Sequence, residues 1–357
     1  MALPFFNSSA RRRDQVVAID LGGRTTKAVH LQRKGDGYAL LRYALMDAPV
    51  QAKTFSADLL AEHLKSIIGT LEVKTKAVTL SLGVNDIIVR QAEMPQIPLQ
   101  DMRMILKANP KAYLQQDLPN HIFDCYIIPP RQLPKVDEKA KVSAISQKFK
   151  VLIAGAKKQL VDDLLLAVDK AGLEAEGIVP GLIGPMNAFE LAMPELFNKS
   201  VVALVDVGFK NTTICLLQDG DLVLSRVVAI GGDKITGGLA EAMAISYAEA
   251  EGIKMGMASE VQPTLEGLIT PLGRELRASI DFFEHQQDKH VSHVFISGGS
   301  ARSEFIVKVL ETEIAFNCRA WSPVGALQLA LPPKQMAELE HVAPQLTVAV
   351  GAAVAAF

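Results

Sequence analysis

The sequence predicts an α/β protein of two duplicated halves, with a small α+β module inserted in the first half. The leading observation is a phrase that occurs twice, at 17–26 and at 204–213. Each copy consists of an apolar strand, an Asp-x-Gly turn and a second apolar strand, which is the pattern of a β-hairpin. The chain of 357 residues is also longer than a single hydrophobic core usually serves, so at least two domains are expected.

The first half is expected at 14–200, and after its hairpin it continues with a helix and a strand. Apolar residues recur at helical spacing over 56–69, and Ser56 is a suitable N-cap for that helix. The apolar run at 77–82 is short enough to be a buried strand. Together these elements predict a mixed sheet with helical cover.

The inserted module is expected at about 84–178, where prolines and polar residues interrupt short apolar segments. Its predicted elements are a strand at 86–93, a mostly helical stretch at 99–116, strands at 123–128 and 148–156, and a helix at 159–171. The polar, lysine-rich stretch at 129–147 is expected to be an exposed, mobile loop.

The second half is expected at 201–344, and a helix at 180–192 leads into its hairpin. A smaller subdomain is expected at about 232–292. The further predicted elements are helices at 231–244, 247–255 and 261–287, a buried strand at 293–296 and a helix at 304–311. The Gly-Gly pair after that strand leads to a helix N-terminus, which is typical both of phosphate contacts and of ordinary structural turns.

The two Asp-x-Gly turns are candidates for phosphate binding. A turn without bulky side chains exposes consecutive N–H groups, and Gly22, Gly23 and Gly208 let the backbone come close to phosphate oxygens. Asp20 and Asp206 would repel phosphate unless a divalent cation lay between them, so we expect them to hold Mg²⁺ through water. One such turn alone would indicate an ordinary hairpin, and the matched pair favours a nucleotide site.

Composition and charge exclude several classes of protein. The formal net charge of −2 gives no strong basic field, so no nucleic-acid partner is expected. No apolar run reaches the roughly 18–20 residues that span a bilayer. The three cysteines have no metal-like spacing and predict a reducing, cytoplasmic location. Residues 1–13 are expected to form a flexible tail, and contact of Arg11–Arg13 with anionic lipid stays open.

With these pieces in this order, the chain resembles the actin-like ATPase superfamily. The phrases at Asp20, Asp206 and Gly298 match its first phosphate, second phosphate and adenosine motifs. Within the superfamily it resembles the PilM family of type IV pilus assembly, which is related to the division protein FtsA. The stretches that carry this likeness are 88–95 with the helix that follows, 224–236 with 248–254, and the ending at 346–353.

The resemblance implies an actin-like ATPase fold with ATP and Mg²⁺ between the halves, and a last helix at 345–357 packing back on the first half. It implies nucleotide contacts from Gly22, Gly23, Thr25, Thr26, Lys27, Gly208, Asn211, Thr212, Gly232, Thr236, Glu251, Lys254, Gly298, Gly299 and Ser300. An alternative for Glu251 and Lys254 is a solvated ion pair on a helix face.

Two departures from the family pattern bear on hydrolysis. Gly23 stands where the family usually has Ser or Thr, and Phe209 and Lys210 stand where strongly hydrolytic relatives have glycines. These changes favour an ATP-binding scaffold, at most a slow ATPase. Attack on the γ-phosphate needs a polar residue to orient water, and the candidates are Asn187 and Glu190, which can equally be helix-surface residues.

The resemblance further implies an adaptor that is cytoplasmic and peripheral to the inner membrane. Its partner would be the short cytoplasmic tail of a PilN-like single-span membrane protein, in a groove between the first half and the inserted module. Candidate groove residues are Arg90, Met102, Ile105 and Leu106, with the alternative that Ile105 and Leu106 belong to the core of the module. A small-molecule kinase of the same superfamily and an FtsA-like filament-forming protein stay open as functions, so self-association is also open.

Overall fold

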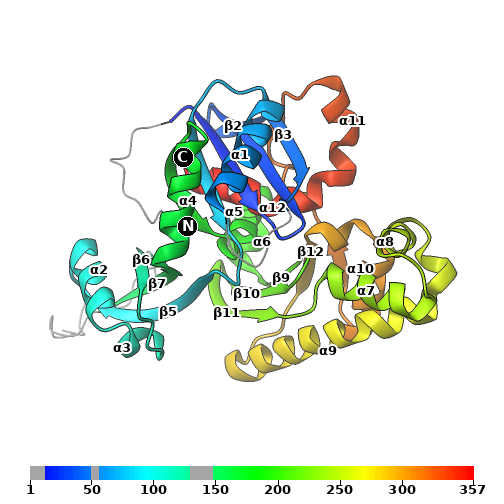
Figure 1. Ribbon diagram of the computed structural model, residues 1–357. Coiled ribbons are helices and arrows are strands. Elements are labelled where there is room, and N and C mark those ends of the chain that lie inside the picture. Colours follow the sequence, from blue (N-terminus) through cyan, green and yellow to red (C-terminus); the bar gives the residue numbers. More distant parts are fainter. Residues whose placement is uncertain (1–12, 50–55, 129–147) are drawn as a thin grey trace.

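The computed structural model describes residues 13–49, 56–128 and 148–357, and it consists of two α/β halves with a smaller unit projecting from the first (Figure 1). The tail predicted at 1–13, apart from its last residue, and the whole loop predicted at 129–147 lie outside the described residues. Within the described ranges, no helix has the length and apolar content needed to cross a membrane.

The first half is built on a six-stranded sheet in the order β14-β3-β2-β1-β4-β8. The strands are β1 (Gln15–Leu21), β2 (Thr25–Lys34), β3 (Gly37–Asp47), β4 (Ala77–Leu82), β8 (Glu174–Pro180) and β14 (Gln328–Leu329). β1, β2 and β3 are antiparallel neighbours, and β4 and β8 extend the sheet in parallel with β1.

Helices cover this sheet, which explains why the middle of β1 is a continuous buried apolar run. α1 (Ala57–Leu71) packs against α4 (Lys158–Lys170). α12 (Thr347–Ala355), coloured red in Figure 1, contacts β1, β2, β4 and α5 (Ile183–Ala192). The sequence predicts that α5 starts at 180, but Pro180 is the last residue of β8 and pairs with Leu82.

The second half repeats the topology in a five-stranded sheet of order β11-β10-β9-β12-β13. Its strands are β9 (Val201–Val207), β10 (Thr212–Gln218), β11 (Asp221–Val228), β12 (His293–Ser297) and β13 (Cys318–Ala320). Again the hairpin strands are antiparallel, and β12 and β13 run parallel to β9. The order β3-β2-β1-β4-β8 therefore matches β11-β10-β9-β12-β13 strand for strand, and the duplication extends from the phrase to the whole sheet.

The helices of the second half gather around one core with the inner face of this sheet. They are α7 (Gly232–Met243), α8 (Tyr247–Gly256), η1 (Ala258–Val261), α9 (Gln262–Gln287), η2 (Gly299–Arg302) and α10 (Glu304–Ile314). A capping box fixes the start of α8: the Ser246 hydroxyl accepts from the Glu249 backbone N–H, and the Glu249 carboxylate accepts from that of Ser246. This start sets the direction in which α8 presents its polar residues.

The inserted unit has its own three-stranded sheet of order β5-β7-β6. Its elements are β5 (Ile87–Pro95), α2 (Leu99–Ala108), α3 (Lys111–Leu114), β6 (His121–Ile127) and β7 (Lys148–Lys157). One face of the sheet joins the core of the first half, and the other packs on α2 and α3. The predicted helix at 99–116 is interrupted because Pro110 has no N–H to continue it.

The insert is shorter than the sequence predicts. The boundary expected at about 178 would include α4 and β8, but β8 lies beside β4 in the main sheet and α4 packs on α1. The separate sheet ends with β7 at Lys157. The boundary was placed too late because α4 and β8 have the same mixed composition as the insert, and only strand pairing assigns them to the first half.

The two halves share a buried contact behind the sheets. α5 and α6 (Pro194–Lys199) lead from the first half to the second, and α11 (Pro333–Val342) and η3 (Ala343–Leu346) lead back to α12. The Phe189 ring lies 4.7 Å from that of Phe295 in β12 and meets the Trp321 ring edge-on at 5.2 Å. This aromatic cluster joins the halves, so the two hairpin turns keep a defined relation to each other.

Candidate nucleotide site between the two halves

The first turn is built around a partly buried ion pair. Asp20 lies at the end of β1, opposite Lys27 on β2, and the Lys27 Nζ donates to Asp20 Oδ2 at 2.9 Å. A Cβ at Gly22 would lie 2.5 Å from both the Lys27 Nζ and the Thr25 carbonyl oxygen. Gly22 is therefore required for the lysine to reach the carboxylate, and the turn keeps a shape with little side-chain bulk.

The second turn places Asp206 at the equivalent point of the second half. Ser297, at the end of β12, donates its hydroxyl to Asp206 Oδ1 at 2.9 Å. Burial raises the pKa of Asp206, while the Ser297 hydrogen bond and the charge of Lys27 act to lower it, and the charge of Asp20 raises it further. The carboxylates of the two halves are thus close enough to influence each other.

The same register relation recurs in both halves. Ser81 on β4 is the Cα partner of Asp20, just as Ser297 on β12 is the Cα partner of Asp206. The Ser81 hydroxyl is buried without a hydrogen-bond partner among the described residues. Each half therefore has an Asp and a Ser side by side at its parallel strand ends, and in the first half Lys27 takes the place of the serine as donor.

The turns and the adenosine motif pack closely together. A Cβ at Gly23 would meet the Phe209 ring at 3.5 Å, so the first turn lies against the second. The Gly208 carbonyl accepts from the Gly232 N–H at 2.9 Å. Gly298 has φ +92°, and a Cβ there would lie 2.5 Å from the Val207 carbonyl oxygen. Glycine is required at this position for the third motif to lie on the second turn.

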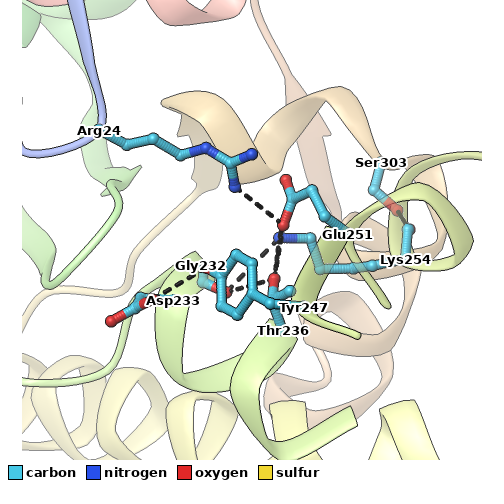
Figure 2. A network of polar contacts seen from close by, with 8 residues as sticks. All are labelled: Arg24, Gly232, Asp233, Thr236, Tyr247, Glu251, Lys254 and Ser303. Carbon is cyan, nitrogen blue, oxygen red and sulfur yellow. Dashed lines mark hydrogen bonds and ion pairs between the residues drawn. The ribbon is translucent and has the colours of Figure 1, made fainter. Parts of the chain in front are cut away.

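A polar network on α7 and α8 forms the far side of the site (Figure 2). Lys254 Nζ donates to Glu251 Oε2 and to Thr236 Oγ1, both at 2.7 Å, and the Thr236 hydroxyl lies 2.6 Å from the same Glu251 oxygen. Burial acts to raise the pKa of Glu251, but the hydrogen bonds from Lys254 and Thr236 outweigh it and the pKa is lowered. Glu251 is therefore a carboxylate at neutral pH.

Lys254 is almost fully buried, and burial lowers its pKa while Glu251 acts to raise it. Its ammonium also lies 3.5 Å from the Gly232 carbonyl oxygen, and its own carbonyl accepts from Ser303. The pair thus joins a buried lysine to a partly buried glutamate, unlike the alternative of a solvated pair on a helix face.

Arg24 connects the first turn to this network. Its guanidinium lies 3.2 Å from Glu251 Oε2 and about midway between two rings, 5.9 Å from the centroid of Phe209 and 5.8 Å from that of Tyr247. The Tyr247 hydroxyl donates to Asp233 Oδ1, and Lys210 pairs with the other oxygen of Asp233, each at 2.9 Å. Polar and aromatic groups of the second half therefore meet around one side chain of the first half.

Some predicted nucleotide contacts have other partners. The Thr26 hydroxyl is buried and lies 2.8 Å from His63 Nε2 of α1. The Thr212 hydroxyl is buried and donates to the Ile230 carbonyl at 2.7 Å. Thr25 and Asn211 shape their turns through backbone carbonyls, and Gly299 and Ser300 begin η2 beside Gly232. Thr26 and Thr212 thus stabilise the turns from inside the protein.

The candidate catalytic residues point to other parts of the molecule. The Asn187 amide donates to the Gly351 carbonyl of α12 at 3.3 Å. Glu190 is exposed, and its charge raises the pKa of Tyr126 on β6 of the insert, to which burial contributes more. These positions do not support a role for either side chain in orienting water at the phosphate turns.

The predicted partner groove needs correction. Met102 and Leu106 are fully buried and form the core of the insert with Val151 and Ile153 of β7. They therefore do not line an open groove. Ile105 is partly buried against the same core, whereas Arg90 on the edge strand β5 is exposed. Helical periodicity alone does not say which apolar residues of an amphipathic helix face inward, and the structure exposes Met104 instead, at 63%.

Sequence reasoning missed four residues that the structure places at the site. Arg24 lies inside the repeated phrase, and its position directly after Gly22 and Gly23 is a signal for it. Ser297 directly precedes Gly298, so it too was within a recognised motif. Nothing in the local pattern indicates Asp233 and Tyr247, because they meet only when α7 and α8 pack together.

The residues present fit a magnesium-bound polyphosphate. Both turns have glycines next to a carboxylate, and a Cβ at Gly22 or Gly208 would lie within 3 Å of atoms of its own hairpin, at 2.5 Å and 2.9 Å. The turns therefore carry no side-chain bulk at these positions. Among the described residues no three His, Cys, Asp or Glu side chains form a group that could hold a metal ion. A magnesium ion at Asp20 and Asp206 would complete its shell with water and phosphate oxygens.

The sequence matches one family model and curated relatives. A family model described as type IV pilus assembly protein PilM matches residues 18–357. The cell division protein FtsA of Bacillus subtilis is 26% identical over 172 residues, which cover 48% of this chain and 38% of that relative. The match thus spans less than half the length of the FtsA chain.

Two solved structures show the same fold. A PilM–PilN type IV pilus biogenesis complex has a TM-score of 0.81 at 20% identity, covering 97% of this chain and 99% of that one. The ethanolamine utilization protein EutJ from Carboxydothermus hydrogenoformans has a TM-score of 0.55 at 14% identity, covering 96% and 90%. The predicted actin-like fold class is confirmed by these likenesses.

Proposed function

Because the chain belongs to the PilM family of type IV pilus assembly proteins, we propose that it is a nucleotide-dependent adaptor. It binds Mg-ATP between its halves and holds the short cytoplasmic tail of a PilN-like single-span membrane protein on its insert. The adaptor is cytoplasmic and reaches the inner membrane through this partner.

The observation that carries nucleotide binding is the matched position of Asp20 and Asp206. Each carboxylate ends a strand inside a duplicated sheet, next to a glycine turn, and the charge of Asp20 acts to raise the pKa of Asp206. Bound Mg-ATP supplies a metal and a chain of phosphates that both turns can hold at once. Asp20 and Asp206 would hold the metal through water, while Lys27 and the turn N–H groups of Gly22, Gly23 and Gly208 would bind phosphate oxygens.

The far side of the site would hold the nucleoside. Glu251 Oε2 is taken by Lys254 and Thr236, which leaves Oε1 free to accept from ribose hydroxyls. Gly298, Gly299 and Ser300 would close over the adenosine. A scaffold role, at most with slow hydrolysis, agrees with the hydrogen bond of Asn187 to α12 and with the effect of Glu190 on Tyr126 of the insert.

Isothermal titration of Mg-ATP and Mg-ADP tests nucleotide binding. We expect micromolar binding of ATP, lost in Asp20→Ala and in Asp206→Ala. Asp36→Ala is the matched control, because Asp36 is an exposed aspartate in the other turn of the first hairpin. No binding by the wild-type protein, or full binding by both site variants, would reject the proposal.

Partner capture is supported by the family and by the likeness to the PilM–PilN complex. On this chain, the insert carries the exposed cation Arg90 on β5, and α2 carries the exposed Met104 and the partly buried Ile105. These groups suit a short apolar tail with an acidic residue. The test is capture of a synthetic PilN-like tail peptide by wild type and by the double variant Arg90→Glu with Met104→Asp. Lys65→Glu, a charge reversal on the exposed face of α1, is the control. Unchanged capture by the double variant would reject this face.

The FtsA relative favours a second candidate function, a nucleotide-dependent filament. Sedimentation with and without Mg-ATP separates the two. An adaptor stays in the supernatant whether Mg-ATP is present or absent. Pelleting of the wild-type protein only with Mg-ATP would support self-assembly.

A further inference from the structure

The starting observation is that every recorded side-chain partner of Arg24 belongs to the other half of the molecule. Arg24 lies in the turn between β1 and β2, and its carbonyl accepts from the Ala48 N–H at 2.8 Å, which anchors its backbone in the first half. Its guanidinium contacts Glu251 and Tyr247, both drawn in Figure 2. It also contacts Phe209, and all three residues belong to the second half. The side chain therefore spans the candidate site.

Arg24 is also held less firmly than two other cations of the site, Lys27 and Lys254. Lys27 is paired with Asp20 at 2.9 Å, and Lys254 is buried between Glu251 and Thr236 at 2.7 Å. The Arg24 pair is longer, at 3.2 Å, and 41% of its side chain is exposed to solvent. An exposed ion pair of this kind contributes little, so Arg24 can change partner at small cost.

Glu251 does not depend on Arg24. The same oxygen already receives Lys254 and the Thr236 hydroxyl, so departure of the guanidinium leaves no unpaired carboxylate. Arg24, by contrast, keeps most of its planar set of donors free for a second ligand, and this set matches the oxygens of a phosphate group. Its backbone lies in the turn that the proposed function assigns to the phosphates.

We propose that Arg24 recognises the terminal phosphate of the nucleotide and thereby distinguishes ATP from ADP. The guanidinium leaves Glu251 for the γ-phosphate when ATP binds, and it stays with Glu251 when ADP binds. This inference rests on the proposed nucleotide site. It adds a positioning residue whose change of partner alters a direct link between the halves.

The test compares the affinities for Mg-ATP and Mg-ADP, measured by isothermal titration, in the full-length protein. In Arg24→Ala we expect ATP affinity to fall about tenfold and ADP affinity to change by less than about threefold, because a charged hydrogen bond is lost only with ATP. Arg24→Lys keeps the charge but loses the planar donors, so an intermediate loss for ATP is expected.

Arg277→Ala is the matched control. Arg277 is also 41% exposed, pairs with Asp281 and lies 5.3 Å from the Phe316 ring centroid, but it is on α9. This variant should keep the wild-type affinities for both nucleotides. Thermal unfolding without nucleotide shows whether each variant is folded.

Three results would overturn the inference. Equal loss of ATP and ADP in Arg24→Ala would make Arg24 only a link between the halves, and no loss of either would remove it from the site. If wild type binds neither nucleotide, the proposed function fails and this inference fails with it. The first two results leave the proposed function intact, so the two failures are distinguishable.

Discussion

The side-chain amide of Gln91, on the edge strand β5 of the insert, donates a hydrogen bond to the carbonyl of Leu222 on the edge strand β11 of the second half. Leu222 also joins the core that includes β1 and the first-half face of the insert. The insert is covalently part of the first half, yet it touches the second. A shift between the halves therefore reaches the insert directly.

This contact predicts that nucleotide and tail binding are coupled through Gln91. In wild type we expect ATP to change the affinity for the tail peptide by about fivefold or more. In Gln91→Ala the ratio of the tail affinities with and without Mg-ATP should move towards one, because the hydrogen bond to β11 is lost. Titration of the peptide with and without Mg-ATP measures it. Gln159→Ala removes an exposed glutamine of α4 as a control, and an unchanged ratio in Gln91→Ala would contradict the coupling route.

Two adjacent glycines should respond very differently to alanine. Gly298 has φ +92° and its Cβ would lie 2.5 Å from the Val207 carbonyl oxygen, whereas a Cβ at Gly299 meets nothing within 4 Å. Gly298→Ala should lower the free energy of unfolding by about 2–3 kcal/mol, and Gly299→Ala should stay within about 0.5 kcal/mol of wild type. Urea unfolding measures both. Similar losses in the two variants would show that the backbone strain is not specific to Gly298.

The pH dependence of stability should report on Asp206. Burial raises its pKa in the folded protein, so the folded state holds the proton more tightly than the unfolded state, whose carboxyl pKa is near 3.9. As pH rises from about 4 through the raised pKa, this group makes the free energy of unfolding fall, by at most about 1.4 kcal/mol per pH unit. Asp206→Asn lacks that contribution.

Urea unfolding at a series of pH values tests this sign. The stability of wild type relative to Asp206→Asn should decrease as pH rises and become constant above the raised pKa. Asp36→Asn, at an exposed aspartate, should follow the wild-type curve. Parallel curves for wild type and Asp206→Asn would contradict the raised pKa.

A hydroxyl added at the first turn should strengthen nucleotide binding. A Cβ at Gly23 would make only ordinary contact with Phe209, at 3.5 Å, so Gly23→Ser can be accommodated. We expect about fivefold tighter binding of Mg-ATP, since a hydrogen bond contributes on the order of 1 kcal/mol. Gly22→Ser is the contrasting variant, because its Cβ would clash with the Lys27 ammonium and the Thr25 carbonyl, and it should weaken binding. If titration shows that Gly22→Ser binds Mg-ATP more tightly than Gly23→Ser, this description of the turn is refuted.

Much of the fold could be predicted from local pattern. The hairpins around Asp20 and Asp206, the helix capped by Ser56 and the long helix after Pro263 follow from periodicity, glycines and caps within a few residues. The predicted helix boundaries are wrong at two prolines. Pro110 interrupts the helix predicted at 99–116, and Pro180 ends a strand instead of starting a helix.

The sequence by itself determined the duplicated hairpins, the glycine turns with their carboxylates, and membership of the family, because each depends on residues close together in the chain. Tertiary structure alone decided that Arg24 meets Glu251, that Gln91 meets Leu222, and that Met102 faces the core. These pairings join residues more than a hundred positions apart, or select one face of a helix. Such choices depend on how whole sheets and helices pack, which no local pattern encodes.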